Sequence, residues 1–382
     1  MNNKFIYTPG PTIVRENVRF ELAKNTTNPD IDIKFYDFYK NTCKKISSIL
    51  NTQNDIYILS GEGILGLEAA CASLTQPGDK VLVIDNGIFG RGFDKFVKMY
   101  GGQVVYFSGD YNKEIDIKEL EKFLEKENDF KYATIVHCDT PTGVLNDLSK
   151  ICPLLKKHNI LTVVDSVSAM VGEKLDIDNW QIDIALGASQ KAISAPAGLC
   201  IVSVSEDAKN AMKNRQVPII GFYSNLTIWQ DYYEKKWFPY TMPINEIIAL
   251  DKAIDNILEE KIENVLARHE KIATATRKAF TEYGLKLYLE NGYSNTVTAV
   301  EIPKEIGALN LTKHILQKYN MLISTSLSDY KDKLLRIGHM GENARLEYVV
   351  YVLNTIDKSL KELGFDSDKN LVELFNKYYS KN

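Results

Sequence analysis

The sequence predicts an α/β protein, with a mostly parallel sheet sandwiched by helices and a smaller α+β domain after it. Its 382 residues, 45% of them hydrophobic, are enough for two domains with buried cores. Between about residues 55 and 205, short apolar runs alternate with helical periodicity. Strands that are apolar throughout and separated by helices are typical of parallel sheets covered on both faces. From about residue 245 the pattern becomes largely helical and carries the chain into a second domain.

The predicted elements follow in order along the chain. We predict strands at 55–60, 80–85, 103–108, 133–138, 161–166, 183–189 and 198–204. Between them we predict helices at 64–74, 118–127 and 147–158. One long helical pattern covers 245–280, and the second domain adds strands near 296–302, 321–325 and 333–339, a helix at 311–319, and helices to the end. We expect a large domain of residues 15–255 and a small domain of residues 256–382, joined by the N-terminal arm 1–14.

Composition and charge exclude several classes of protein. A net charge of −4 gives no basic excess that would point to nucleic acid or to an anionic membrane. The start of the chain has no apolar segment long enough for a signal peptide, and no apolar run is long enough to span a bilayer. The five cysteines lack CxxC pairing, and the five histidines lack metal-ligand spacing. We therefore expect a cytoplasmic protein with reduced cysteines and no metal site.

Polar residues stand at the ends of four predicted strands, where parallel sheets bind their ligands. The sequence SGEG, residues 60–63, lies between a strand and a helix, where small residues admit a phosphate to the helix N-terminus or simply pack tightly. Asp165 ends a strand, where a carboxylate either caps the next segment or pairs with a cationic atom. The segment HCDTPTG, residues 137–143, is by itself a turn. Lys191 follows an apolar run and has small neighbours.

Together these features are the parts that pyridoxal phosphate requires: a phosphate cradle, an anion for the pyridine nitrogen and a lysine for the aldehyde. A free lysine has a pKa of about 10.4, so its surroundings must favour the reactive neutral amine. Nucleotide-binding folds also cradle phosphate, but the sequence contains neither GxGxxG nor GxxxxGK[ST]. The combination therefore favours pyridoxal phosphate chemistry.

The chain resembles the class V aminotransferases of the fold-type I pyridoxal-phosphate enzymes. Within them it is similar to the branch of alanine–glyoxylate, serine–pyruvate and 2-aminoethylphosphonate–pyruvate aminotransferases. The resemblance covers nearly the whole chain. It rests on TPGPT (8–12), SGEGILGLEAA (60–70), NGIFG (86–90), VHCDTPTGVL (136–145), VVDSVSAMVG (163–172), GASQKAISAPAG (187–198), PYTMP (239–243) and LLRIGHMG (334–341).

The resemblance implies a role for each matching residue. Lys191 would be the Schiff-base lysine and the base that moves the substrate's α-proton, and Asp165 would pair with the pyridinium nitrogen. Arg336 would grip the substrate carboxylate, and Gly10 would lie close to the bound substrate. The other residues implied to touch the cofactor are Ser60, Gly61, Glu62 and Gly63 at the phosphate, Phe89 on the ring, Thr142 near the ring oxygen, and Gln190.

Two further segments bear on the site. Tyr240 and Thr241 match a segment that, in the family, reaches the phosphate from the neighbouring subunit, which implies a homodimer. Glu62 departs from the family, where a hydroxyl or small residue often stands. An ionised glutamate would repel a phosphate dianion, so we expect its side chain to point away and only its backbone N–H to serve. Ile64 likewise offers no hydroxyl, and residues 25–39 match no particular substrate class.

The resemblance implies ping-pong transamination from a small donor, alanine or serine, to glyoxylate or pyruvate. A 2-aminoethylphosphonate donor is the alternative, because Arg336 would bind a phosphonate as well as a carboxylate. A pyridoxal-phosphate lyase or cysteine desulfurase would use the same sheet, but no cysteine for a desulfurase nucleophile follows Cys200. A non-catalytic α/β binding protein with a structural Lys191 is the third class. We expect His137 and His339 to be packing residues.

Overall fold

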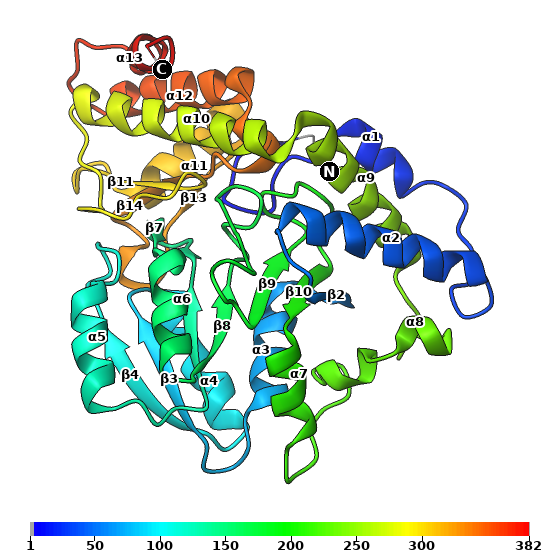
Figure 1. The fold of residues 1–382 in the computed structure, drawn as a ribbon. Helices are drawn as coiled ribbons and strands as arrows, with labels where there is room; N and C mark the ends of the chain where they lie inside the picture. Colours follow the sequence, from blue (N-terminus) through cyan, green and yellow to red (C-terminus); the bar gives the residue numbers. More distant parts are fainter. Residues whose placement is uncertain (1–3, 382) are drawn as a thin grey trace.

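A seven-stranded sheet organises the first part of the chain in the computed structural model, which describes residues 4–381 (Figure 1). Its strands are β2 (Asp55–Ser60), β3 (Lys80–Asp85), β4 (Gln103–Ser108), β5 (Tyr132–Val136), β8 (Leu161–Asp165), β9 (Ile184–Ala188) and β10 (Leu199–Val204). They lie in the order β2-β10-β9-β8-β5-β3-β4. Neighbouring strands are parallel except at β10, which runs antiparallel to both β2 and β9. The predicted mostly parallel sheet is confirmed.

Helices cover both faces of this sheet (Figure 1). The covering helices are α2 (Ile33–Ile49), α3 (Gly63–Leu74), α4 (Ile88–Met99), α5 (Ile117–Lys126), α6 (Leu148–Lys157) and α7 (Glu206–Lys213). Several begin at a side chain that accepts backbone N–H groups of the first turn, as Asp32 does for α2, Asp116 for α5 and Ser205 for α7. Helix α3 packs against α4, and α5 packs against α6. The short α1 (Glu16–Glu21) packs against α9 (Ile244–Glu260), and α8 (Tyr232–Lys235) precedes α9.

Two predicted elements are interrupted in the structure, while the others shift by a few residues at their ends. The single helical pattern over 245–280 is two helices, α9 and α10 (Ile262–Tyr283), which break at Lys261 with a φ of +69°. The predicted strand 133–138 ends at Val136, because Cys138–Asp139 (β6) turns back to pair with Val144–Leu145 (β7). Periodicity does not reveal either break, since both flanks keep the same pattern of apolar residues.

The last third of the chain builds a smaller unit around a three-stranded antiparallel sheet. Its strands are β11 (Thr298–Glu301), β13 (Ser324–Thr325) and β14 (Leu334–Ile337), in the order β11-β14-β13. The helices α11 (Ala308–Tyr319), α12 (Leu346–Glu362) and α13 (Leu371–Tyr379) join α10 in covering it (Figure 1). The arm contributes β1 (Phe5–Ile6), which pairs in parallel with β12 (Met321–Leu322).

The buried apolar residues form two main clusters. The first surrounds the large sheet and extends to Val265, and the second joins Tyr7 of the arm to residues between Ile272 and Phe375. The change of packing therefore falls within α10, whereas the predicted domain boundary at 255/256 falls inside α9 and stays a prediction. Among residues 4–381, no helix combines the length and the apolar character needed to cross a bilayer.

Candidate active site

The carboxyl ends of β2, β5, β8 and β9 meet at one edge of the large sheet, and a cavity of about 170 Å³ opens there. Its lining residues are Glu62, Gly63, Ile64, Leu67, Phe89, Thr140, Asp165, Val167, Ser168 and Lys191. Strand ends thus bring five of the predicted site residues together: Glu62, Gly63, Phe89, Asp165 and Lys191. They come from four separate segments of the sequence.

Lys191 lies in the turn that follows β9. Its Nζ donates a hydrogen bond to the backbone oxygen of Pro9, at 2.7 Å. Burial lowers the pKa of Lys191 to about 8, and the positive charge of Arg336 acts in the same direction, while the Asp165 carboxylate opposes it. An amine with this pKa is about one-tenth neutral at pH 7, roughly 200 times more than a free lysine. The position therefore holds a lysine that is ready to react as a neutral amine.

Gly10, in the N-terminal arm, lies in close contact with the side chain of Lys191. Its φ is +86°, in the left-handed region that favours glycine, and a Cβ built there would lie 2.7 Å from Cε and 2.9 Å from Nζ of Lys191. No larger residue fits without moving the lysine. The structure thus places Gly10 against the amine, and its contact with bound substrate stays a prediction.

Asp165 ends β8 and is buried. Its Oδ1 accepts a hydrogen bond from the Val167 N–H at 2.8 Å, so it caps the next segment, and it also lines the cavity. Burial raises the pKa of Asp165 to about 6, while the Val167 N–H and the charge of Lys191 oppose that rise. The carboxylate is therefore ionised at neutral pH and stands as an anion on the cavity wall.

The start of α3 differs from the expectation. Glu62 is the N-cap: its Oε1 accepts from the Ile64 N–H at 3.0 Å, and its Oε2 accepts from Gln190 Nε2 at 3.3 Å. The prediction that this side chain points away is wrong. The first N–H groups of a helix lack partners within the helix, and a carboxylate one residue before them satisfies that need.

Two other predicted phosphate contacts are engaged elsewhere. The N–H of Ser60 donates to the Tyr240 hydroxyl at 3.3 Å, and the N–H of Gly61 donates to the backbone oxygen of Gly198 at 2.8 Å. Tyr240 stacks on Tyr223 with ring centroids 4.4 Å apart. Tyr240 therefore lies beside the start of the segment 60–63 of its own chain.

Thr241 is exposed beside Tyr240. That either residue reaches the site of a second subunit stays a prediction.

The segment after β5 contributes Thr140 to the cavity. The Thr140 hydroxyl shares a hydrogen bond with Ser168, another lining residue. Thr142, the predicted neighbour of the ring oxygen, lies outside the lining residues, and its Oγ1 accepts from the Val144 N–H in its own turn, at 3.4 Å. The register of this turn decides which threonine faces the cavity, and the sequence does not distinguish Thr140 from Thr142 in this respect.

Asp139 lies in the segment 137–143, for which the sequence by itself predicts only a turn. Its Oδ2 accepts from the N–H groups of Phe89 at 2.8 Å and Gly90 at 3.2 Å, at the first turn of α4. Its Oδ1 is buried and has no hydrogen-bond partner among residues 4–381. Burial raises the pKa of Asp139 to about 7. Asp139 thereby fixes the turn from which Phe89 enters the cavity wall.

Arg336 lies in β14, on the smaller unit. Its Nε donates to the Thr325 oxygen at 2.8 Å, and its Nη1 to the Thr140 oxygen at 3.4 Å. The side chain is buried, and among residues 4–381 no carboxylate stands within ion-pair distance of it. Burial lowers its pKa to about 10, although the Asp139 carboxylate opposes that change. A buried cation without a paired anion favours an anionic ligand, and its planar fork suits a carboxylate.

The histidines near the site are structural, as expected. The Nδ1 of His137 pairs with the Ser166 hydroxyl at 3.0 Å, and the Nε2 of His339 pairs with the Thr298 hydroxyl at 2.8 Å. Burial lowers the pKa of each to about 3, so both rings stay neutral at working pH.

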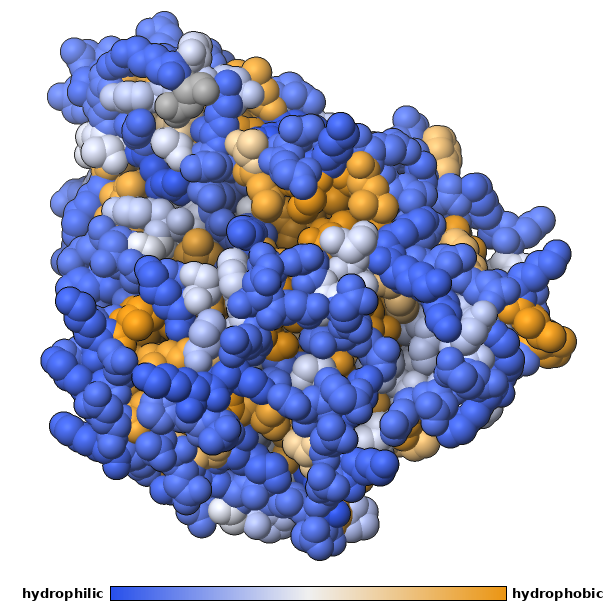
Figure 2. Space-filling view, viewed as in Figure 1, coloured by the Kyte–Doolittle hydropathy of each residue, from blue (hydrophilic) through white to orange (hydrophobic). Residues whose placement is uncertain are grey.

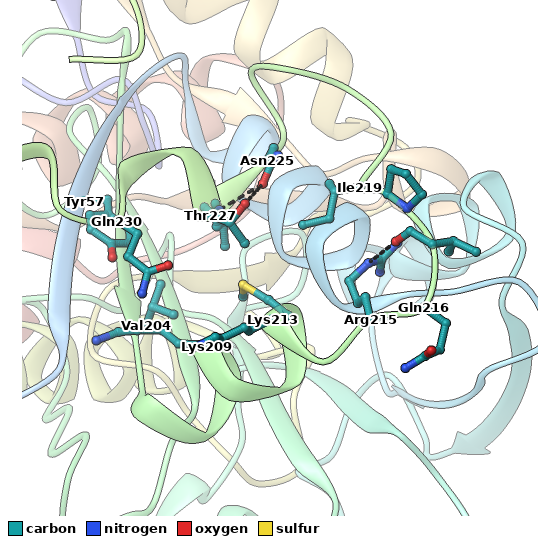
Figure 3. A pocket seen from close by; sticks show the side chains of 14 residues that line it. Tyr57, Val204, Lys209, Lys213, Arg215, Gln216, Ile219, Asn225, Thr227 and Gln230 are labelled. Atoms are coloured by element: carbon teal, nitrogen blue, oxygen red, sulfur yellow. Dashed lines mark hydrogen bonds between the residues drawn. The ribbon is translucent and has the colours of Figure 1, made fainter. Parts of the chain in front are cut away.

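A larger cavity of about 520 Å³ lies elsewhere, beside α7 and the segment 215–230 (Figure 3). None of the predicted site residues lines it. Two of its cations are engaged: Lys209 pairs with Asp55 at 2.6 Å, and Arg215 donates to the backbone oxygen of Ser73 at 3.2 Å. The chemistry is therefore assigned to the smaller cavity, which holds the lysine–aspartate pair.

Comparisons with known proteins match this chain over most of its length. The family model of class-V aminotransferases matches residues 17–327. An uncharacterized aminotransferase of Methanocaldococcus jannaschii is 34% identical over 376 residues, which cover 97% of this chain and 96% of the relative. The pyridoxamine–pyruvate transaminase of Mesorhizobium japonicum is 31% identical, covering 94% and 91%. The solved ureidoglycine–glyoxylate aminotransferase of Bacillus subtilis superposes with a TM-score of 0.95 at 26% identity, covering 100% of this chain and 99% of that one.

Proposed function

This chain belongs to the class-V aminotransferase family, and from that premise we propose that it moves an amino group from alanine or serine to glyoxylate or pyruvate. It is a transaminase of the pyridoxal-phosphate-dependent class. Two relatives described above use, by their names, pyruvate and glyoxylate, which supports these oxo acids as acceptors. The proposed mechanism is ping-pong, with donor and acceptor using the same site in turn.

One observation carries the proposal: a lysine amine with a lowered pKa faces a buried carboxylate in one cavity, with an unpaired arginine nearby. Three lining residues would hold the cofactor's ring: Lys191 would bind its aldehyde, Asp165 would pair with its ring nitrogen, and Phe89 would pack on its face. When bound, the cofactor supplies an aldehyde for the amino group and an electron-withdrawing ring.

The chain's own residues supply the rest of the chemistry. Lys191, as the neutral amine, takes the proton from the α-carbon of the amino donor. In the second half of the reaction it returns a proton to the α-carbon of the acceptor. Asp165 would place its negative charge at the ring nitrogen of the bound cofactor and keep that nitrogen protonated. Arg336 binds the substrate carboxylate and orients the α-carbon. The arm at Gly10 covers the amine and limits access of water.

Two alternatives differ in what they need from the chain. A 2-aminoethylphosphonate donor would place its phosphonate on Arg336, whose unpaired guanidinium suits either anion. A cysteine desulfurase needs a reactive thiolate, whereas all five cysteines are buried, and burial raises the pKa of Cys138, beside the site, to about 12. The phosphonate donor is therefore the second candidate, and the desulfurase is disfavoured.

A homodimer in the cytoplasm is part of the proposal. Large apolar side chains are exposed on α1 and on the segment before α9, namely Phe20, Ile220, Phe222, Tyr223 and Trp237. Figure 2 shows a mostly hydrophilic face that is interrupted by an apolar area near α9. Exposed apolar groups of this kind are typical of surfaces that associate. The segment that carries Tyr240 would then stand at the junction of two subunits.

The test uses the visible absorbance of the protein with added pyridoxal phosphate. Alanine, serine and 2-aminoethylphosphonate are added singly, and pyruvate or glyoxylate follows. We expect one donor to bleach the band and one oxo acid to restore it. Lys191→Ala should abolish both changes, while the matched variant Lys213→Ala, at an exposed lysine of the larger cavity, should keep them. Turnover by Lys191→Ala would overturn the assignment.

A further inference from the structure

The start of α3 carries a carboxylate at the position where the family resemblance places a phosphate. Glu62 bonds the Ile64 N–H, so a carboxylate already stands at the helix N-terminus where a phosphate would bind. The N–H groups of Ser60 and Gly61 donate to other oxygens. A phosphate would therefore have to displace Glu62 and would find two of the expected donors engaged.

Gln190 gives an independent indication. Its side chain is buried and lies against Glu62 through the 3.3 Å bond from Nε2 to Oε2. Its Oε1 is buried and has no hydrogen-bond partner among residues 4–381. An unpaired buried acceptor requires a donor. A hydroxyl offers one, whereas a phosphate dianion offers only acceptors.

The charges of the cavity point the same way. Its lining residues include one cation, Lys191, and two carboxylates, Glu62 and Asp165. Arg336 is not among the lining residues, and its guanidinium bonds the backbone oxygens of Thr325 and Thr140. A dianion entering at α3 would meet the Glu62 carboxylate, and the one lining cation, Lys191, is the group that the aldehyde requires.

We propose that Glu62 makes this site bind the unphosphorylated pyridine compounds, pyridoxal and pyridoxamine, in preference to pyridoxal phosphate. The proposal rests on the proposed function, because it uses the same ring site and the same lysine. The ring's 5-hydroxymethyl group donates to the Glu62 carboxylate or to Gln190 Oε1. The ring compound then acts as the amino donor itself and not as a resident coenzyme. The inference thus keeps the lysine and the oxo-acid acceptors of the proposed function and replaces its alanine or serine donor.

The reaction that follows is balanced. Pyridoxamine and an oxo acid give pyridoxal and an amino acid: the aminomethyl carbon of the ring is oxidised to the aldehyde, and the carbonyl carbon of the acceptor is reduced to an amine. The amino group and the carbonyl oxygen exchange places, and no further oxidant is needed. Lys191 moves the proton between the two carbons, as in the proposed function.

Equilibrium binding tests the preference without any catalysis. The probes are pyridoxine and pyridoxine 5′-phosphate, which lack the aldehyde and differ only in the phosphate, and calorimetry measures both dissociation constants. We expect the wild type to bind pyridoxine about tenfold or more tightly than its phosphate, from repulsion between a carboxylate and a dianion a few ångströms apart. Glu62→Gln and Glu62→Ser should each shift that ratio towards the phosphate by about tenfold.

Glu68→Gln is the matched control, because Glu68 lies on the same helix but bonds Tyr100, away from the cavity; its ratio should equal that of the wild type. Tighter binding of the phosphate by the wild type, or a ratio unchanged in both Glu62 variants, would overturn this inference and leave the transaminase proposal standing. Failure to bind pyridoxine and its phosphate, together with failure to bind pyridoxal and pyridoxal phosphate, would overturn both.

Discussion

Replacing Gly10 by alanine should disable the site by displacing Lys191. The added Cβ would lie 2.7 Å from Cε and 2.9 Å from Nζ, whereas carbon atoms in contact need about 3.5 Å or more. The lysine must therefore move by roughly 1 Å and loses its bond to the Pro9 oxygen. A displacement of this size in a catalytic group lowers rates by about 100-fold. We expect that loss in kcat/KM, measured with the best donor and acceptor.

Gly78→Ala separates the clash from the backbone strain. Gly78 has a φ of +89°, close to that of Gly10, but a Cβ there meets nothing within 4 Å. Both substitutions place an L-residue in the left-handed region, which lowers the free energy of unfolding by about 1–2 kcal/mol. Urea denaturation measures that shared loss, and only Gly10→Ala should lose activity. Equal activity of the two variants would refute the contact between the arm and the lysine.

Three further predictions concern charge. Arg336→Gln should raise KM for the amino donor and the oxo acid by about tenfold to a hundredfold, because a charged hydrogen bond is lost. It should also raise the Lys191 pKa above about 8, because the charge of Arg336 lowers it. The rising limb of the pH–rate profile then moves to higher pH, and an unmoved limb would contradict this prediction. Asp165→Asn should slow α-proton exchange, followed by deuterium washout, by about 100-fold or more because the ring nitrogen loses its anion; normal exchange would dismiss that role. Burial raises the Asp139 pKa from 3.8 to about 7, so the folded chain binds more protons than the unfolded chain in that window and stability falls as pH rises. Asp139→Asn should flatten that fall in melting curves, and an unchanged slope would show that other groups cause it.

The sheet was predictable because each strand is a continuous apolar run that ends in a polar or small residue. Asp165 and Lys191 could be placed at one edge on that basis, since parallel strands align their carboxyl ends. The break at Lys261 could not be predicted, because the apolar periodicity continues across it and only the backbone of one residue changes. The same limit applies to the turn after β5, where Thr140 rather than Thr142 faces the cavity.

Glu62 shows why the orientation of a side chain was harder to predict than the place of its residue at a strand end. The expectation that it turns away came from repulsion by a ligand. The structure instead reflects what the chain itself supplies: a helix N-terminus with unpaired N–H groups and the amide of Gln190, both of which attract the carboxylate. Without a measured affinity for the ligand, the sequence does not say which attraction is stronger.

The arm explains how the smaller unit takes part in the chemistry of the large sheet. Strand β1 pairs with β12, so the arm belongs to the packing of the smaller unit, yet its Pro9 oxygen and Gly10 lie on Lys191. Just after the strand that bears Arg336, a Cβ on Gly338 would lie 2.6 Å from Pro9 Cα, so arm and strand are in close contact. The arm therefore contacts both the strand that bears Arg336 and the side chain of Lys191. A substitution in the arm at Pro9 or Gly10 is therefore expected to disturb the large sheet's lysine and the smaller unit's arginine strand together.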